Sequence, residues 1–152
     1  MTWFMQIFKS RTLAIGLAII VIVSVTFNLN ISRMGYAKTY VTSQYEAESA
    51  TLNSVTTNTN HTGYTGSGFV DGYSTAGDYV QFSISVSTAG DYTLLFRYAN
   101  DTGKKASRKV YVDGNEIAMA VFPDLANWDT WGVAEVGTNL ASGSHTVKIQ
   151  YN

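Results

Sequence analysis

The chain changes its pattern of hydrophobic and polar positions near residue 38. Before this point, Leu13–Phe27 is an apolar run interrupted only by Ser24 and Thr26. After it, apolar and polar residues alternate over short segments, which Gly, Ser, Thr and Asn separate. A long apolar run is typical of a targeting segment, whereas alternation with a period of two predicts β-strands with one buried face.

The alternation is clearest in two consecutive segments. In Tyr79–Val86, every second residue is Val, Phe or Ile, and the residues between them are Gln and Ser. Tyr92–Tyr98 repeats the pattern with aromatic residues and Leu on one face. Thr88–Asp91 has the composition of a turn that joins the two strands.

The other segments after residue 38 also have patterns that predict strands. Asp113-Gly114 is a hairpin signal, because both residue types tolerate positive φ. No window of useful length shows the apolar period of about 3.6 residues that a helix needs, so no α-helix is expected after Tyr40. Regularly spaced short strands predict an all-β fold, an antiparallel β-sandwich. The further strands are expected at Lys109–Val112, Ile117–Phe122, Trp131–Val136 and His145–Tyr151.

The N-terminal segment has the features of an export signal. Basic residues precede an apolar run that is shorter than the roughly 20 residues of a membrane span. Gly35 and Ala37 suit a cleavage site, so residues 1–37 are expected to be a signal peptide. The alternative is an uncleaved signal anchor, because Met1–Phe8 is itself apolar. In both cases residues 38–152 are expected to be secreted or held on the outside of the cell, with a bacterial surface favoured.

Composition narrows the choice of partners. A net charge of −1 offers no basic face for nucleic acid, so no nucleic-acid partner is expected. The chain has no cysteine, which excludes disulfides and thiolate zinc sites. Its one basic cluster, Lys104, Lys105, Arg108 and Lys109, is interpreted as a solvated loop and strand end. Membrane contact is expected only through the N-terminal segment, if that segment is not cleaved.

Seven short strings with matching order and spacing give the chain a family resemblance. Together they resemble carbohydrate-binding module family thirty-five and, more distantly, family six. The resemblance runs from about Tyr45 to Tyr151, nearly the whole region after the leader. The strings are Tyr45–Glu48 (YEAE), Gly63–Gly72 (GYTGSGFVDG), Gly77–Val80 (GDYV), Ala89–Tyr92 (AGDY), Arg97–Asn100 (RYAN), Trp128–Trp131 (WDTW) and Gly143–Val147 (GSHTV).

The resemblance implies a β-jelly-roll that binds sugars. The expected function is non-catalytic binding of poly- or oligosaccharide, which targets an appended polysaccharide-active enzyme to its substrate. The family pattern continues past His145–Tyr151 into a loop and a final strand that carries an Asp, whereas this chain stops at Asn152. The module at 38–152 is therefore expected to be C-terminally truncated, with His145–Tyr151 at a sheet edge and a catalytic domain further along a longer protein.

Glu46 and Glu48 are the candidate metal ligands. Residues two apart on a strand project from one face, so their carboxylates are expected to lie together. Ca²⁺ takes about six to eight oxygen ligands and suits such a pair. By spacing alone, two solvated glutamates on an edge strand are the simpler interpretation. In the family that the chain resembles, this pair ligates a structural calcium, and calcium is therefore the expected cofactor.

The candidate sugar-binding residues are aromatic and polar side chains near predicted loops. A pyranose packs its C–H face on an aromatic ring, and the resemblance implies a cleft with two aromatic walls. Trp128 matches one wall, and Phe69 or Tyr64 matches the other. Asn100 is a candidate for hydrogen bonds to sugar hydroxyls, with a turn role as the alternative. Asp71 is expected to contact sugar, to hold a second calcium or to cap a turn.

The sequence favours a binding module over an enzyme. His61 and His145 are the only histidines, and beside His145 and Ser144 no third group is expected to orient the histidine in a catalytic triad. Glu46 and Glu48 are too close together to act as the separated acid and base of a hydrolase. The alternative function is a cell-surface adhesion or structural β-sandwich without a sugar site. An open cleft flanked by Trp128 and Phe69 favours sugar binding, whereas two buried rings favour the alternative.

Overall fold

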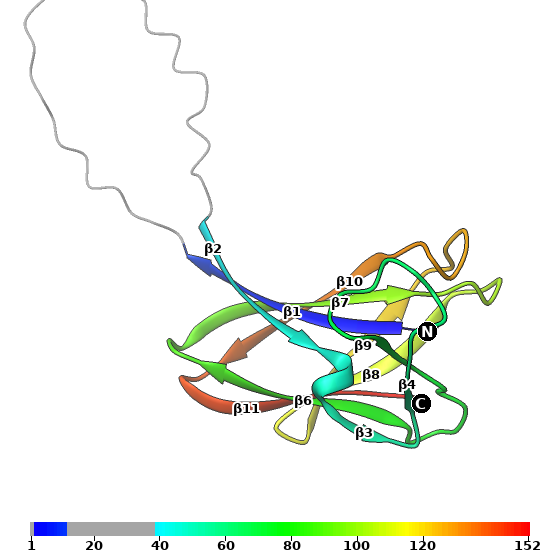
Figure 1. The fold of residues 1–152 in the computed structure, drawn as a ribbon. Coiled ribbons are helices and arrows are strands. Elements are labelled where there is room, and N and C mark those ends of the chain that lie inside the picture. The colour runs from blue at the N-terminus through cyan, green and yellow to red at the C-terminus, as the bar shows by residue number, and fades with distance from the viewer. Residues whose placement is uncertain (1, 12–38) are drawn as a thin grey trace, which may run out of the picture.

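The computed structural model describes residues 2–11 and 39–152, which form a β-sandwich (Figure 1). Every pairing between strands is antiparallel. The strands are β1 (Thr2–Arg11), β2 (Thr39–Glu46), β3 (Thr51–Asn53), β4 (Thr56–Asn58), β5 (Phe69–Asp71), β6 (Tyr79–Val86), β7 (Gly90–Ala99), β8 (Ala106–Val112), β9 (Asn115–Phe122), β10 (Gly132–Leu140) and β11 (Gly143–Gln150), and the 3₁₀ helix η1 (Ala47–Ser49) follows β2.

Two larger sheets form the layers of the sandwich. One has the strand order β10-β7-β1-β2, and the other has the order β3-β6-β11-β8-β9. A small third sheet pairs β4 with β5. The prediction of an all-β antiparallel sandwich of the jelly-roll type is confirmed. Within the described residues, the only helical element is the single turn of η1.

The core lies between the two larger sheets and follows the alternation in the sequence. On β6, Val80, Phe82 and Ile84 are buried, while Ser83 and Ser85 are exposed. β7 contributes its own alternating set of buried aromatic and leucine side chains. The period-two pattern therefore identified the inward faces correctly, because neighbouring residues on a strand face opposite sides of the sheet.

The turn between β8 and β9 also follows the prediction. Asp113 has a φ of 50° and Gly114 a φ of 80°, the left-handed pair that a two-residue hairpin uses. His145 and Thr146 on β11 fix this turn. The Asp113 Oδ1 accepts a hydrogen bond from the Thr146 backbone N–H at 2.8 Å, and Oδ2 lies 2.7 Å from Nδ1 of His145.

Two expectations about the strands are wrong, and three short strands were not predicted. The strand at His145–Tyr151 is central, because β11 lies between β6 and β8, and its Val147 and Ile149 are fully buried. Glu48 does not share a strand with Glu46, because β2 ends at Glu46 and Glu48 lies in η1. The short strands β3, β4 and β5 have only three residues each, too few for alternation to be visible in the sequence.

The N-terminal signal peptide stays a prediction. Its apolar run, Leu13–Phe27, lies outside the described residues. Thr2–Arg11, also within the expected leader, forms β1. Among residues 2–11 and 39–152, no helix has the length and apolar composition needed to cross a membrane.

Candidate functional site

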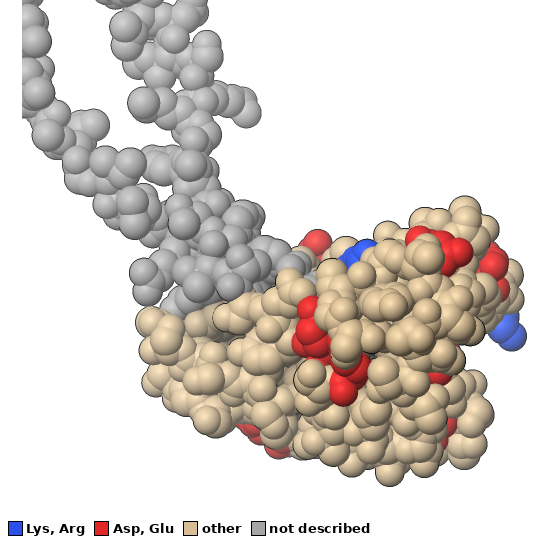
Figure 2. Space-filling model, viewed as in Figure 1, with Lys and Arg blue, Asp and Glu red and all other residues tan. Residues whose placement is uncertain are grey.

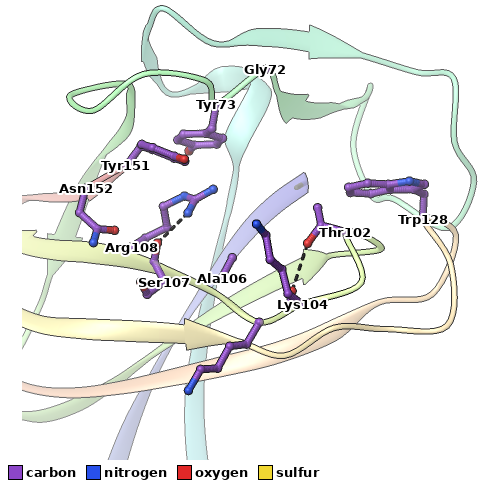
Figure 3. A pocket seen from close by; sticks show the side chains of 11 residues that line it. Gly72, Tyr73, Thr102, Lys104, Ala106, Ser107, Arg108, Trp128, Tyr151 and Asn152 are labelled. Carbon is purple, nitrogen blue, oxygen red and sulfur yellow. Dashed lines mark hydrogen bonds between the residues drawn. The ribbon is translucent and has the colours of Figure 1, made fainter.

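A pocket of about 430 Å³ opens where loops from distant parts of the chain meet the start of β8. Figure 3 shows Arg108 reaching towards the rings of Tyr73 and Tyr151, with Trp128 at the opposite end of the pocket. The pocket is lined by Gly72, Tyr73, Thr102, Lys104, Lys105, Ala106, Ser107, Arg108, Trp128, Tyr151 and Asn152.

Arg108 is the charged centre of this pocket. It is only 7% exposed, and its guanidinium carbon lies 4.4 Å from the ring centroid of Tyr151 and 5.1 Å from that of Tyr73. Nη1 donates a hydrogen bond to the Ser107 carbonyl at 2.6 Å, whereas the buried Nε has no partner within the described residues. Burial lowers the pKa of Arg108, and burial also raises the pKa of Tyr73, which keeps that phenol neutral.

Backbone hydrogen bonds bring the two tyrosines to Arg108. The Tyr151 N–H donates to the Asp78 carbonyl at 2.8 Å, and the Tyr151 carbonyl accepts from the Gly77 N–H at 3.0 Å. Asp78 is 4% exposed, and its carboxylate accepts hydrogen bonds from the backbone N–H groups of Ser74 and Thr75, which lower its pKa. These bonds fix the loop that carries Tyr73 beside the end of β11.

Trp128 is held at the pocket by a second loop network. The carboxylate of Asp129 accepts a hydrogen bond from the Thr62 N–H at 2.6 Å, and this bond lowers the pKa of Asp129. The Asn127 Oδ1 accepts hydrogen bonds from the Asp129 N–H and the Thr130 hydroxyl. The His61 ring lies 6.1 Å from that of Trp128. The loop is therefore tied to the segment before β5, which limits how far the indole can move.

Phe69 and Tyr64 do not line this pocket. Phe69 is 1% exposed, and its ring lies 5.7 Å from that of Tyr64 and 5.9 Å from that of His61. His61 thus lies between Phe69 and Trp128. Of the two rings expected to flank an open cleft, Trp128 borders the pocket and Phe69 is packed inside the fold.

Asn100 and Asp71 have structural contacts. Asn100 is fully buried, and its Nδ2 donates to the carbonyls of Lys104 at 2.9 Å and Phe122 at 3.0 Å. It therefore shapes the loop that carries the lysines of the pocket. The Asp71 carboxylate accepts hydrogen bonds from Thr56 and Asn58, which join β4 to β5. Of the five candidate sugar contacts, Trp128 alone lines the pocket.

The sequence interpretation missed Arg108 by treating it as part of a solvated cluster. Lys104 and Lys105 are indeed exposed, but Arg108 is buried in phase with Val110 and Val112 on β8. The alternation of Arg108, Val110 and Val112 in the sequence would have placed Arg108 on the same face as the two valines. No pattern in the sequence indicated that Tyr73 and Tyr151 contact Arg108, because this contact depends on which loops come together in the fold.

The acidic pair forms a second polar cluster, away from the pocket. Figure 2 shows acidic atoms gathered on the surface where η1 lies in Figure 1. The Glu46 Oε2 accepts a hydrogen bond from the Thr65 hydroxyl at 3.0 Å, and the Glu48 Oε1 accepts one from the Ser67 N–H at 2.7 Å. Glu48 Oε2 is buried and has no partner within the described residues.

Gly66 allows this loop to approach the carboxylates. Its φ is +67°, and a Cβ atom at this position would lie 2.1 Å from Oε1 of Glu48. Only glycine fits such an approach without movement of the backbone. A cation could bind here to the unpaired Oε2 of Glu48, beside the loop that Gly66 brings close to the carboxylates. No group of three or more His, Asp or Glu side chains suited to a metal is found in the described part of the chain.

Comparison with known proteins assigns most of the chain to one family. Residues 43–152 match the family model described as "Carbohydrate binding module (family 35)". A cycloisomaltooligosaccharide glucanotransferase from Niallia circulans is 48% identical over 119 residues, which cover 78% of this chain and 12% of that protein. The chain therefore corresponds to a small part of this much longer relative.

Solved structures give the same result. A cycloisomaltooligosaccharide glucanotransferase from Paenibacillus sp., solved in complex with cycloisomaltoheptaose, is similar with a TM-score of 0.70 and 45% identity, over 71% of this chain and 16% of that one. A family 35 carbohydrate binding module from Clostridium thermocellum has a TM-score of 0.67 and 31% identity, over 70% of this chain and 82% of that one.

Proposed function

Because the chain belongs to carbohydrate-binding module family 35, we propose that the pocket around Arg108 and Trp128 is its sugar-binding site. The observation that carries this proposal is Arg108 itself, a buried guanidinium that faces an open pocket with one donor unused. A buried donor without a partner costs free energy, and a hydroxyl or carboxylate oxygen of a ligand would remove that cost.

The other side chains around Arg108 suit a sugar. The indole of Trp128 and the ring of Tyr151 offer apolar faces on which the C–H face of a pyranose packs. Lys104 supplies hydrogen-bond donors to sugar hydroxyls, and Asn152 supplies both donors and an acceptor. A volume of about 430 Å³ is within the range of small-ligand pockets and has room for one or two sugar residues.

We take α-1,6-linked glucose oligosaccharides as the favoured ligand class. The support is the similarity to two glucanotransferases named for cycloisomaltooligosaccharides, at 48% and 45% identity. A second candidate is a uronic acid, because Lys104, Lys105 and Arg108 make the lining cationic and an arginine pairs with a carboxylate through two hydrogen bonds.

The proposed role is to hold an appended enzyme near its polysaccharide. Binding at one site is expected to be weak, with a Kd of roughly micromolar to millimolar, or about −8 to −4 kcal/mol. Weak binding suffices because tethering raises the effective concentration of the enzyme at its substrate. The relative from Niallia circulans, of which the matched segment is 12%, supports this arrangement. The rival function, an adhesion or structural sandwich, has no use for the open pocket at Trp128.

Calorimetric titration of the full chain with isomaltotriose and with glucuronate tests the proposal. We expect measurable binding of one of them, and we expect Trp128→Ala to weaken it at least about tenfold, as loss of an aromatic contact residue does. Tyr111→Ala is the matched control, because Tyr111 lies on β8 but does not line the pocket. Equal affinity in the Trp128 and Tyr111 variants would contradict the assignment of the site.

We also propose that Glu46 and Glu48 hold a structural calcium ion. The buried, unpaired Oε2 of Glu48 and the close approach of Gly66 support this fit. Calcium bound there would neutralise two adjacent carboxylates and tie η1 to the loop before β5. The strand beside Glu46 adds no carboxylate at this level, because Phe4 of β1 is in register with Glu46.

Thermal unfolding with calcium or with EDTA tests this second proposal. An ion that binds only the folded chain raises the Tm by mass action. We expect the Tm difference to vanish in Glu48→Gln and to persist in Glu135→Gln, an exposed control on β10. An unchanged difference in Glu48→Gln would show that the ion, if bound, lies elsewhere.

A further inference from the structure

The N-terminal strand β1 lies inside a sheet, between two strands that belong to other parts of the chain. It pairs with β2 from Phe4 to Arg11 and with β7 from Thr2 to Lys9. Figure 1 shows β1, in dark blue, running alongside β7, with cyan β2 on its other side. Both pairings are antiparallel, so β2 and β7 run in the same direction as each other.

Without β1, the sheet has a gap of one strand. Neighbouring strands lie about 4.8 Å apart, so β2 and β7 are separated by about twice that distance and cannot bond to each other directly. Within the described residues, β1 is the only strand that pairs with β2. Its loss leaves unpaired N–H and C=O groups on the facing edges of β2 and β7, which an extended segment can satisfy from both sides at once.

The residues of β7 define which segment fits the gap. Leu94 and Phe96 on β7 are 0% and 1% exposed and face the core. Ile7 is in register with Leu94, and Met5 is in register with Phe96. Residues directly opposite each other on antiparallel strands lie on the same face, so the gap requires apolar residues at alternate positions. Gln6, between them, is in register with the half-buried Leu95 and occupies the other face.

The connection between β1 and β2 is much longer than that of a hairpin. Arg11 and Thr39 are in register, yet residues 12–38 connect them, where a hairpin needs only about two to five residues. The described contacts that hold the strand are its pairings with β2 and β7. It also lies within the segment that an export signal would remove.

We propose that the gap between β2 and β7 is an acceptor site for one extended antiparallel strand with apolar residues at alternate positions. Thr2–Arg11 of the same chain is its occupant. Retention of the N-terminal segment completes the sheet, and removal of that segment opens the acceptor site. The fate of the leader and the stability of the sandwich are thus coupled through one strand.

Two lysine substitutions at adjacent positions of the full chain test the proposal. Ile7→Lys puts a charge at the position in register with the buried Leu94, and Gln6→Lys puts the same charge at the position in register with the half-buried Leu95. We expect Ile7→Lys to lower the Tm by at least about 5 °C and to speed amide hydrogen exchange in β2 about tenfold or more. Gln6→Lys should change neither, and Ile7→Ala should give the Ile7→Lys pattern with a smaller shift.

A synthetic peptide with the sequence of residues 2–11 supplies the second measurement. Added to the Ile7→Lys chain, it should displace the defective strand and restore slow exchange in β2, while a peptide carrying the same lysine should not. Equal exchange in the Ile7→Lys and Gln6→Lys chains, or an Ile7→Lys chain that the matching peptide does not rescue, would overturn the proposal.

Discussion

Arg97 and Arg108 are two desolvated guanidinium groups that the fold uses in opposite ways. Arg97, on β7, stacks 4.3 Å from the ring centroid of Trp131 and donates from Nη2 to the Gly63 carbonyl. Arg108, on β8, stacks on tyrosines and faces the pocket. Desolvation by burial lowers the pKa of both. Each is on a strand next to an aromatic ring, so neither sequence position nor ring contact distinguishes them.

The difference lies in what surrounds each charge. The carboxylate of Glu46 raises the pKa of Arg97 and so opposes the effect of burial, and the bond to Gly63 ties Arg97 to a loop. Around Arg108 the groups that raise its pKa are the two tyrosines, and within the described residues it forms no ion pair. Each arginine also has one buried donor without a partner among the described residues, Nη1 of Arg97 and Nε of Arg108. What makes the Arg108 donor available for a ligand is the open pocket that Arg108 lines and Arg97 does not.

Replacement of Arg108 should have the largest effect on binding. Arg108→Met keeps an unbranched apolar stem and removes the charge and donors. We expect sugar affinity, measured by calorimetry, to fall at least about 100-fold, which corresponds to roughly 2.7 kcal/mol and is typical of a central contact residue. The Tm should stay the same or rise, because a buried, unpaired charge is lost. A variant that binds normally would remove Arg108 from the site.

The same replacement at Arg97 should do the reverse. Arg97→Met removes the hydrogen bond to Gly63 and the stack on Trp131, so we expect the free energy of unfolding in urea to fall by about 2 kcal/mol. Sugar affinity should remain within about twofold, because Arg97 does not line the pocket. If Arg97→Met weakens binding as much as Arg108→Met does, the two arginines do not have separate roles.

How far the sequence could predict the fold depends on whether a feature is set by neighbouring residues or by contacts between distant segments. Strands such as β6 and β7 were predictable because one apolar face repeats every second residue, and the turn at Asp113 was predictable because of its residue types. The central place of β11 was not, because strand order depends on pairings between distant segments. The position of a strand in its sheet depends on the whole fold, so the local alternation of residues does not predict it.

The candidate site was predictable only in part for a related reason. Trp128 was identified because an aromatic residue in a polar stretch is poorly placed for the core, and it does line the pocket. Phe69 had similar surroundings in the sequence, yet β5 carries it inward against His61 and Tyr64. Tyr73 lies beside Arg108 because backbone hydrogen bonds join its loop to the end of β11. Residue spacing in the sequence does not predict such a contact between distant segments.

The smallest effect on stability should come from the contact between His145 and Asp113, because the Asp113 carboxylate is partly exposed to solvent. Hydrogen bonding to the Asp113 carboxylate raises the pKa of His145, and the same contact lowers the pKa of Asp113. A raised histidine pKa stabilises the fold fully below the unfolded value of about 6.5, and this contribution is lost as the pH rises through the folded pKa. An aspartate whose pKa is lowered in the folded state stabilises the fold above about pH 3.9, and this contribution to stability is lost as the pH falls through the folded pKa.

The contribution of this pair should therefore be greatest between about pH 4 and 6.5. Because the Asp113 side chain is 46% exposed, solvent screening limits the expected gain to about 0.5 kcal/mol. Urea unfolding of the native chain and of His145→Gln at pH 5 and pH 9 measures it: the difference in unfolding free energy should shrink at pH 9, and high salt should reduce it at pH 5. A difference that is the same at both pH values would show that His145 stabilises the turn by packing and neutral hydrogen bonds. In that case its charge would contribute nothing, unlike the desolvated charges of Arg97 and Arg108.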